Sequence, residues 1–162
     1  MAELIAARLE GIVDFDGVKR YDLLAVADTV AAQPFGAKLL CETALEVADF
    51  VNAPYNYAHE VAAMLLCEGA ATILETNYDD CIERAAQPER PPVARNADEL
   101  LNGPSGPLLK AHGCATLRTT MLLTTAQLAS VDLWASATVT ARLAQDTVVF
   151  VGIGSVADYG LS

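Results

Sequence analysis

Short apolar runs separated by helical segments are the feature that most limits what this chain can fold into. Four such runs lie at 71–75, 107–113, 120–124 and 146–154, bounded by Gly, Pro, Thr or Asp. Runs this short and this apolar are typical of strands that a parallel sheet buries on both faces. Because helical segments lie between them, at 79–86 and 131–145, the sequence predicts an α/β layered fold.

The part of the chain before these runs carries helical patterns instead. Apolar residues recur there at spacings of three and four, which predicts amphipathic helices at 19–33, at 37–51 and after Pro54. The third helix is expected to end at Gly69. The predicted apolar faces are Leu23, Ala27 and Val30, then Leu40, Ala44, Val47 and Val51, then Ala58, Val61 and Leu65.

The segment 87–107 holds most of the prolines of the chain. Because proline interrupts both helices and strands, we expect a loop there, with one helical turn at 97–101. The sequence shows no internal repeat and no boundary between domains. We therefore expect a single domain over 1–162, with a helical part at 1–69 and a strand-helix part at 70–162.

Charge and cysteine content limit the expected partners and compartment. The formal net charge of -11 disfavours nucleic acid and anionic membranes through long-range repulsion. The four cysteines form no CxxC pair, so neither a zinc module nor a disulfide framework is expected, which favours a reducing cytoplasm. No signal peptide is evident, and no apolar stretch approaches the roughly 20 residues that span a bilayer. We expect a globular cytoplasmic protein, and its apolar helices are compatible with a homo-oligomer.

Clusters of polar residues and glycines follow each of the predicted strands. They lie at 76–80, at 112–113, at 124–125 and at 152–155. In an open parallel sheet, ligands bind beyond the carboxyl ends of the strands. If the strands are neighbours, the four clusters line one edge of the sheet, and this edge is the candidate site.

Three of these motifs resemble, in order and spacing, the sirtuin-like domains of bacterial NAD-consuming proteins, including phage-defence proteins. The motifs are TNYDD with the Ile-Glu pair that follows it, then LLKAHG, then VVFVGIGSVAD after a further helix. The resemblance covers 70–162. It implies a three-layer, Rossmann-like parallel sheet that takes the small dinucleotide NAD as its substrate, without a metal.

The resemblance also implies a reaction and roles for named residues. The reaction is that of an NAD glycohydrolase, which cleaves the bond between nicotinamide and ribose and releases ADP-ribose. Asn77 would position the ribose or the incoming water, and His112 would be the general base, a role that suits an imidazole with an ordinary pKa near 6.5. Asp79 would hold the nicotinamide carboxamide. The implied cofactor-binding residues are Thr76, Asp79, Gly113, Gly152, Gly154 and Ser155.

Two departures from the family pattern limit this implication. The family normally opens with a strand and a Gly-Ala-Gly-x-Ser loop that holds the pyrophosphate, and nothing here matches them, so the domain is expected to be incomplete at its N-terminus. Deacetylating sirtuins also carry a four-cysteine zinc module after the HG motif. The segment between Gly113 and Thr124 supplies only Cys114, so protein deacetylation is not expected.

The same residues also have structural interpretations. Asn77 and Asp79 could cap the helix that follows them, and His112 next to Gly113 could be a turn histidine bonded to the backbone. Gly152 and Gly154 could simply form a tight strand-to-helix turn, with Ser155 as its cap. Three hypotheses therefore stay open. The domain could be an NAD glycohydrolase, a sensor that binds NAD or ADP-ribose without cleaving it, or a degenerate domain kept for oligomerisation. Assays of nicotinamide release and of NAD binding separate them.

Overall fold

The computed structural model describes residues 1–102, 108–129 and a few isolated positions between Ala137 and Val151. The predicted strand at 146–154 and most of the predicted helix at 131–145 lie outside these residues. The described elements, in chain order, are α1 (Ala2–Arg8), α2 (Leu23–Ala31), α3 (Gly36–Val47), α4 (Tyr57–Cys67), β1 (Ile73–Glu75), α5 (Cys81–Ala85), β2 (Val93–Ala94), α6 (Ala97–Asn102), β3 (Leu108–Lys110), the 3-10 turn η1 (Arg118–Thr120) and α7 (Thr125–Ala129).

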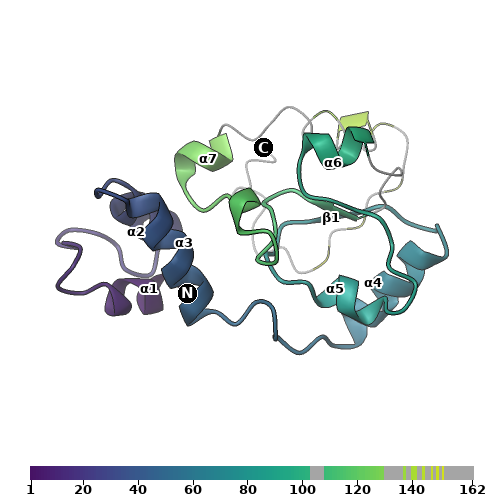
Figure 1. The fold of residues 1–162 in the computed structure, drawn as a ribbon, viewed down its shortest axis with the longest axis horizontal. Helices are drawn as coiled ribbons and strands as arrows, with labels where there is room; N and C mark the ends of the chain where they lie inside the picture. Colours follow the sequence, from purple (N-terminus) through teal and green to yellow (C-terminus); the bar gives the residue numbers. More distant parts are fainter. Residues whose placement is uncertain are drawn as a thin grey trace.

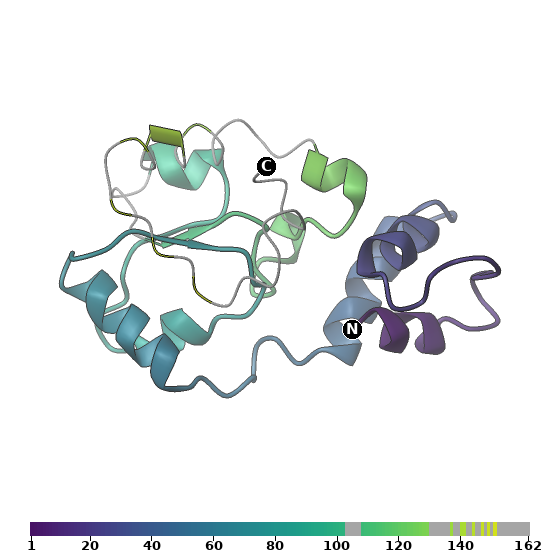
Figure 2. The same cartoon turned by 180° about the vertical axis from the view of Figure 1, so that it is seen from behind.

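The strands form one parallel sheet in the order β1-β3-β2, with β3 in the centre. Leu108 and Leu109 of β3 are buried because the strand has a neighbour on each side and is covered on its faces. Helices α4 and α5 lie on one side of the sheet and α6 lies on the other (Figures 1 and 2). The predicted α/β fold with a parallel sheet and N-terminal helices is confirmed.

Two apolar clusters hold these elements together. One joins α4 and α5 to the sheet through Ala63, Leu66, Ile82 and Leu108. The other joins α1, α2 and α3 to the segment that follows β3. Its buried residues include Ile5, Val26, Val30, Leu40, Ala44, Ala115, Met121 and Leu123. The three N-terminal helices therefore pack on the chain just beyond the candidate site, at one end of the sheet (Figure 1).

The N-terminal helices follow the predicted pattern with two corrections. The helix predicted at 37–51 ends at Val47, where the backbone turns to an extended conformation at Ala48, so Val51 lies outside it and is exposed. In α4 the buried residues are Ala63 and Leu66 rather than Ala58, Val61 and Leu65. Packing against α5 determines which face of α4 is buried. The spacing of apolar residues in the sequence placed this face one residue earlier along the helix.

Two predictions about strands were wrong. The apolar run at 120–124 is not a strand, because Met121 and Leu123 are buried against the N-terminal helices. In its place the short strand β2 lies inside the segment 87–107, which was predicted to be a loop. The helical turn expected at 97–101 is confirmed as α6. No helix of the described residues has the length and apolar character that crossing a membrane requires.

Candidate functional site

The carboxyl ends of β1 and β3 lie side by side and bring two of the predicted clusters together. Glu75 and Lys110 are paired in register, and the ladder continues one step further, where the Ala111 amide donates to the Glu75 carbonyl at 2.9 Å. Thr76 and His112 therefore leave the sheet from adjacent strands. The turn that carries Asn77 and Asp79 starts beside the turn that carries His112.

His112 lies against the first of these turns. The imidazole is half-buried, is hydrogen-bonded to the backbone of Thr76 and has its ring centroid 6.5 Å from that of Tyr78. Burial lowers the pKa of His112 below its ordinary value, and the hydrogen bond to Thr76 opposes this shift only in part. The neutral imidazole, the form that can accept a proton, is therefore favoured at neutral pH.

Asn77 and Asp79 differ in their burial and in their hydrogen bonds to the rest of the protein. Asn77 is exposed, and its amide group makes no hydrogen bond to the described part of the chain. Asp79 is half-buried, and its Oδ1 accepts a hydrogen bond from the Cys81 amide at 3.0 Å, at the start of α5. One oxygen of Asp79 thus makes a capping contact with the first amide of α5, from the residue before the N-cap Asp80. The neighbouring Asp80 pairs with Arg84 at 2.8 Å instead.

Gly113 has a conformation that other residues rarely adopt. Its φ is +85°, and a Cβ there would lie 2.0 Å from the carbonyl oxygen of Thr120. The chain folds back at this point, so that the Leu122 amide donates to the His112 carbonyl at 2.9 Å. The close approach that requires glycine is therefore one made by the protein's own backbone. The remaining predicted residues, Gly152, Gly154 and Ser155, lie outside the described residues.

The sequence pattern did not predict the most deeply buried charged residue at this edge of the sheet. Lys110 is fully buried, and its ammonium pairs with Glu75 at 2.8 Å and with Glu83 of α5 at 3.4 Å. The signal was present in the sequence, since the acidic Glu75 follows Ile73 and Leu74 as the basic Lys110 follows Leu108 and Leu109. Polar residues at strand ends usually face water, and only the paired register shows that these two face each other.

Tyr78 connects the two turns to the N-terminal helices. Its ring packs edge-on against Phe50 with centroids 5.6 Å apart, and its hydroxyl donates to the Leu122 carbonyl. Burial raises the pKa of the phenol to about 12, so it stays a hydrogen-bond donor at neutral pH. Tyr78 therefore holds the turn after β1 against the segment that follows β3.

Replacing Tyr78 with Phe tests this connection. The change keeps the ring and removes one hydrogen bond to a partly buried carbonyl, so we expect unfolding to become easier by about 1–1.5 kcal/mol. Urea unfolding followed by circular dichroism measures it. Tyr57→Phe is the matched control, because Tyr57 is 78% exposed and should change stability by less than about 0.5 kcal/mol. Equal effects of the two variants would contradict the proposed connection.

Three potential metal ligands lie close together beside the candidate site. Single donor atoms of His59, Asp79 and Cys81 all lie within 4.8 Å of one another. Nδ1 of His59 already accepts a hydrogen bond from the Asn56 amide at 3.0 Å, so Nε2 carries the proton of the neutral ring. Burial raises the pKa of the Cys81 thiol to about 11, which keeps it protonated. These donors are engaged within the fold and do not fit a metal ion in this arrangement.

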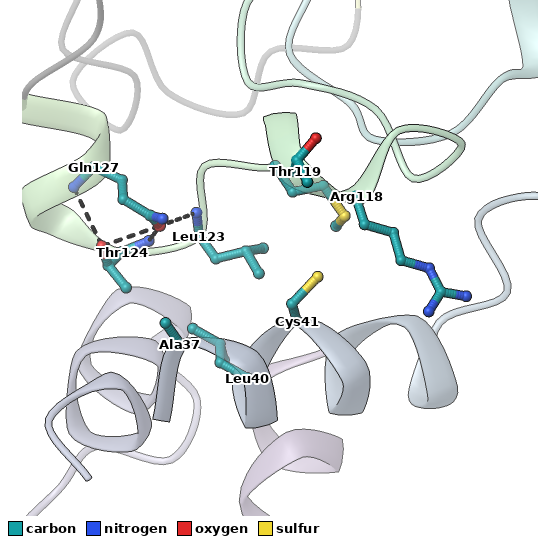
Figure 3. A pocket seen from close by; sticks show the side chains of 9 residues that line it. Ala37, Leu40, Cys41, Arg118, Thr119, Leu123, Thr124 and Gln127 are labelled. Carbon is teal, nitrogen blue, oxygen red and sulfur yellow. Dashed lines mark hydrogen bonds between the residues drawn. The ribbon is translucent and has the colours of Figure 1, made fainter. Parts of the chain in front are cut away.

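A cavity of about 120 Å³ lies between α3 and the segment that includes η1 and α7. Figure 3 shows Cys41 of α3 facing Arg118 and Thr119 across it, with Gln127 hydrogen-bonded to Thr124 at its edge. None of Asn77, Asp79 and His112 lines this cavity. It belongs to the contact between the N-terminal helices and the rest of the chain.

Comparison with known proteins adds one finding. The family model for the SIR2-like domain matches residues 71–158, a little over half of the chain. No curated protein and no solved structure matches the chain. The matched range begins just before β1, and it includes both the turn after β1 and the turn after β3. The chain therefore belongs to the SIR2-like domain family.

Proposed function

We propose that this SIR2-like domain is an NAD glycohydrolase whose reaction takes place at the carboxyl ends of β1 and β3. SIR2-like domains use NAD, so the substrate class follows from the family. The observation that supports the proposal most directly is the adjacency of the two strand ends, which puts the turn with Asn77 next to His112. This is the position at which open parallel sheets bind their ligands.

The reaction requires the protein only to position NAD and a water molecule and to provide a general base. The glycosidic bond from ribose C1′ to the nicotinamide nitrogen breaks, and its electron pair neutralises the pyridinium as nicotinamide leaves. A water molecule attacks C1′, and His112 accepts the proton that the water loses. The neutral imidazole suits this role because burial disfavours its charged form.

Asn77 and Asp79 would orient the two ends of the bond that breaks. The exposed amide of Asn77 can donate to a ribose hydroxyl and accept from the attacking water. Asp79 would accept a hydrogen bond from the nicotinamide carboxamide. Because its Oδ1 already caps α5, the second carboxylate oxygen would make that contact.

Binding of NAD without cleavage is the second candidate. The capping role of Asp79 favours it, because one of the implied ligand-binding groups is partly used by the fold. Residues 1–72 also contain helices and no strand, so the usual strand and Gly-rich loop for the pyrophosphate are absent from that part of the chain. A shift in melting temperature with NAD, without release of nicotinamide, would identify a sensor.

The test is incubation with NAD and measurement of released nicotinamide. We expect the wild-type protein to release nicotinamide and Asn77→Ala to lower kcat by about 100-fold, the size of effect that loss of a positioning group produces. Asn52→Ala is the matched control, since Asn52 is an exposed asparagine whose side chain donates to Asp49. Cleavage that survives both Asn77→Ala and His112→Ala would show that the mechanism is wrong.

A further inference from the structure

Lys110 reaches further than an ion pair between neighbouring strands requires. It is the last residue of the central strand β3, and its side chain is fully buried. Besides Glu75 and Glu83, its ammonium donates a hydrogen bond to the backbone carbonyl of Asp79. A single side chain thus joins the end of β1, the turn after it, and α5.

Burying these three ionisable side chains costs free energy of folding. One ammonium faces two carboxyl groups, so it can balance the charge of only one of them. Burial raises the pKa of Glu75 to about 7 in spite of the ammonium beside it. Glu83 Oε1 is buried and has no hydrogen-bond partner among the described residues, although it lies within ion-pair distance of Lys110. Buried ion pairs are often no more stabilising than apolar residues of similar volume, so stability alone does not account for this group.

The contact with Asp79 is the part that a purely structural ion pair would not need. The turn from Thr76 to Asp80 carries Asn77 and Asp79. Lys110 is the last residue of β3 and lies two residues before His112. We infer that Lys110 is the positioning residue of the candidate site, because its ammonium fixes the turn after β1 relative to His112. This inference rests on the proposed NAD cleavage for its catalytic consequence.

The first experiment separates positioning from stability. Lys110→Met alone leaves two buried carboxylates without a cation, so it is expected to destabilise the protein and is uninformative about the site. The triple variant Lys110→Met, Glu75→Gln, Glu83→Gln removes all three charges together. We expect its melting temperature to return close to the wild-type value, whereas kcat for NAD cleavage stays lower by about 30-fold or more with KM changed less than about 3-fold.

Lys38→Met is the matched control for loss of a lysine that pairs with a glutamate. Lys38 pairs with Glu42 on α3, and its side chain is 78% exposed, so this variant should keep wild-type melting temperature and kcat. If the triple variant regains both stability and kcat, Lys110 is only structural and the inference is overturned. If the triple variant does not fold, the double variant Lys110→Met, Glu75→Gln takes its place. Failure of both to fold would also overturn the inference.

A second readout does not depend on NAD. The Ala115 amide donates to the Tyr78 carbonyl at 2.8 Å, so its hydrogen exchange reports whether the turn after β1 stays in place. We expect exchange of Ala115 to become at least about 10-fold faster in the triple variant, while the amide of Val26 in α2 keeps its wild-type rate. Unchanged exchange at Ala115 would overturn the inference. A wild-type protein that neither binds nor cleaves NAD would refute the proposed function, and the exchange result would still decide whether Lys110 fixes the turn.

Discussion

Replacement of His112 with alanine is expected to lower kcat for NAD cleavage by about 10²–10⁴-fold, the contribution of a positioned general base. The expectation rests on geometry as well as residue type. The imidazole follows β3 directly beside the turn that carries Asn77, and it is held by the Thr76 backbone. His59→Ala is the matched control, because His59 lies on α4, where it contributes to the N-terminal cap. Its ring lies close to Asp79 but serves the cap of α4 and takes no part in the proposed proton transfer, so this variant should lower stability slightly and leave kcat within about 3-fold.

The pH dependence of kcat/KM is a second test of His112 as the general base. Burial lowers the pKa of His112 from its ordinary value near 6.5, and the neutral form is the base. The acid limb should therefore have its midpoint below pH 6.5, with activity lost as the pH falls through it. In His112→Gln this acid limb should be absent from the residual activity.

Glu75 is the group most easily confused with His112 in such a profile. Its pKa is raised to about 7 by burial, so its titration falls near the same pH range. Glu75→Gln separates the two, because the acid limb should persist in this variant if His112 is responsible. A limb centred near pH 7 that persists in His112→Gln and disappears in Glu75→Gln would assign the profile to Glu75 and contradict the role of His112.

The elements that could be predicted from the sequence are those whose burial follows from local pattern. β1 and β3 were predicted because each is a short apolar run, and the sheet buries β3 on both faces. β2 is only Val93–Ala94 and follows two prolines, so its apolar content is too small to distinguish it from a loop. The run at 120–124 is apolar for a different reason. Leu122 bonds to the His112 carbonyl, while Met121 and Leu123 pack in the core with the N-terminal helices.

The candidate site shows the same division. The positions of Asn77 and His112 could be predicted, since polar residues that follow adjacent parallel strands meet at one edge. The interactions of Lys110 could not, because its burial depends on α5 covering the strand ends, and Glu83 comes from that helix. Roles in phage defence, location in the cytoplasm and assembly into homo-oligomers stay predictions, since they depend on partners and surroundings outside the chain.

Gly113→Ala is expected to lower the stability of the protein by about 2–5 kcal/mol. Two costs add at this position. The φ of +85° is unfavourable for a residue with a Cβ by about 1–2 kcal/mol. The added methyl group would also lie 2.0 Å from the Thr120 carbonyl oxygen, and such overpacking costs about 1–3 kcal/mol more. Urea unfolding at neutral pH measures the sum.

Gly69→Ala isolates the first of these costs. Gly69 has a similar φ of +67°, at the end of α4, but nothing lies within 4 Å of where its Cβ would be. This variant should therefore lose only about 1–2 kcal/mol of stability. If the two variants are equally destabilised, the close approach of Thr120 to Gly113 does not contribute to the loss of stability. If Gly113→Ala is the more destabilised, the glycine after His112 is explained by the backbone that folds against it, and a cofactor contact at Gly113 needs evidence of its own, such as a rise in KM for NAD beyond that of Gly69→Ala.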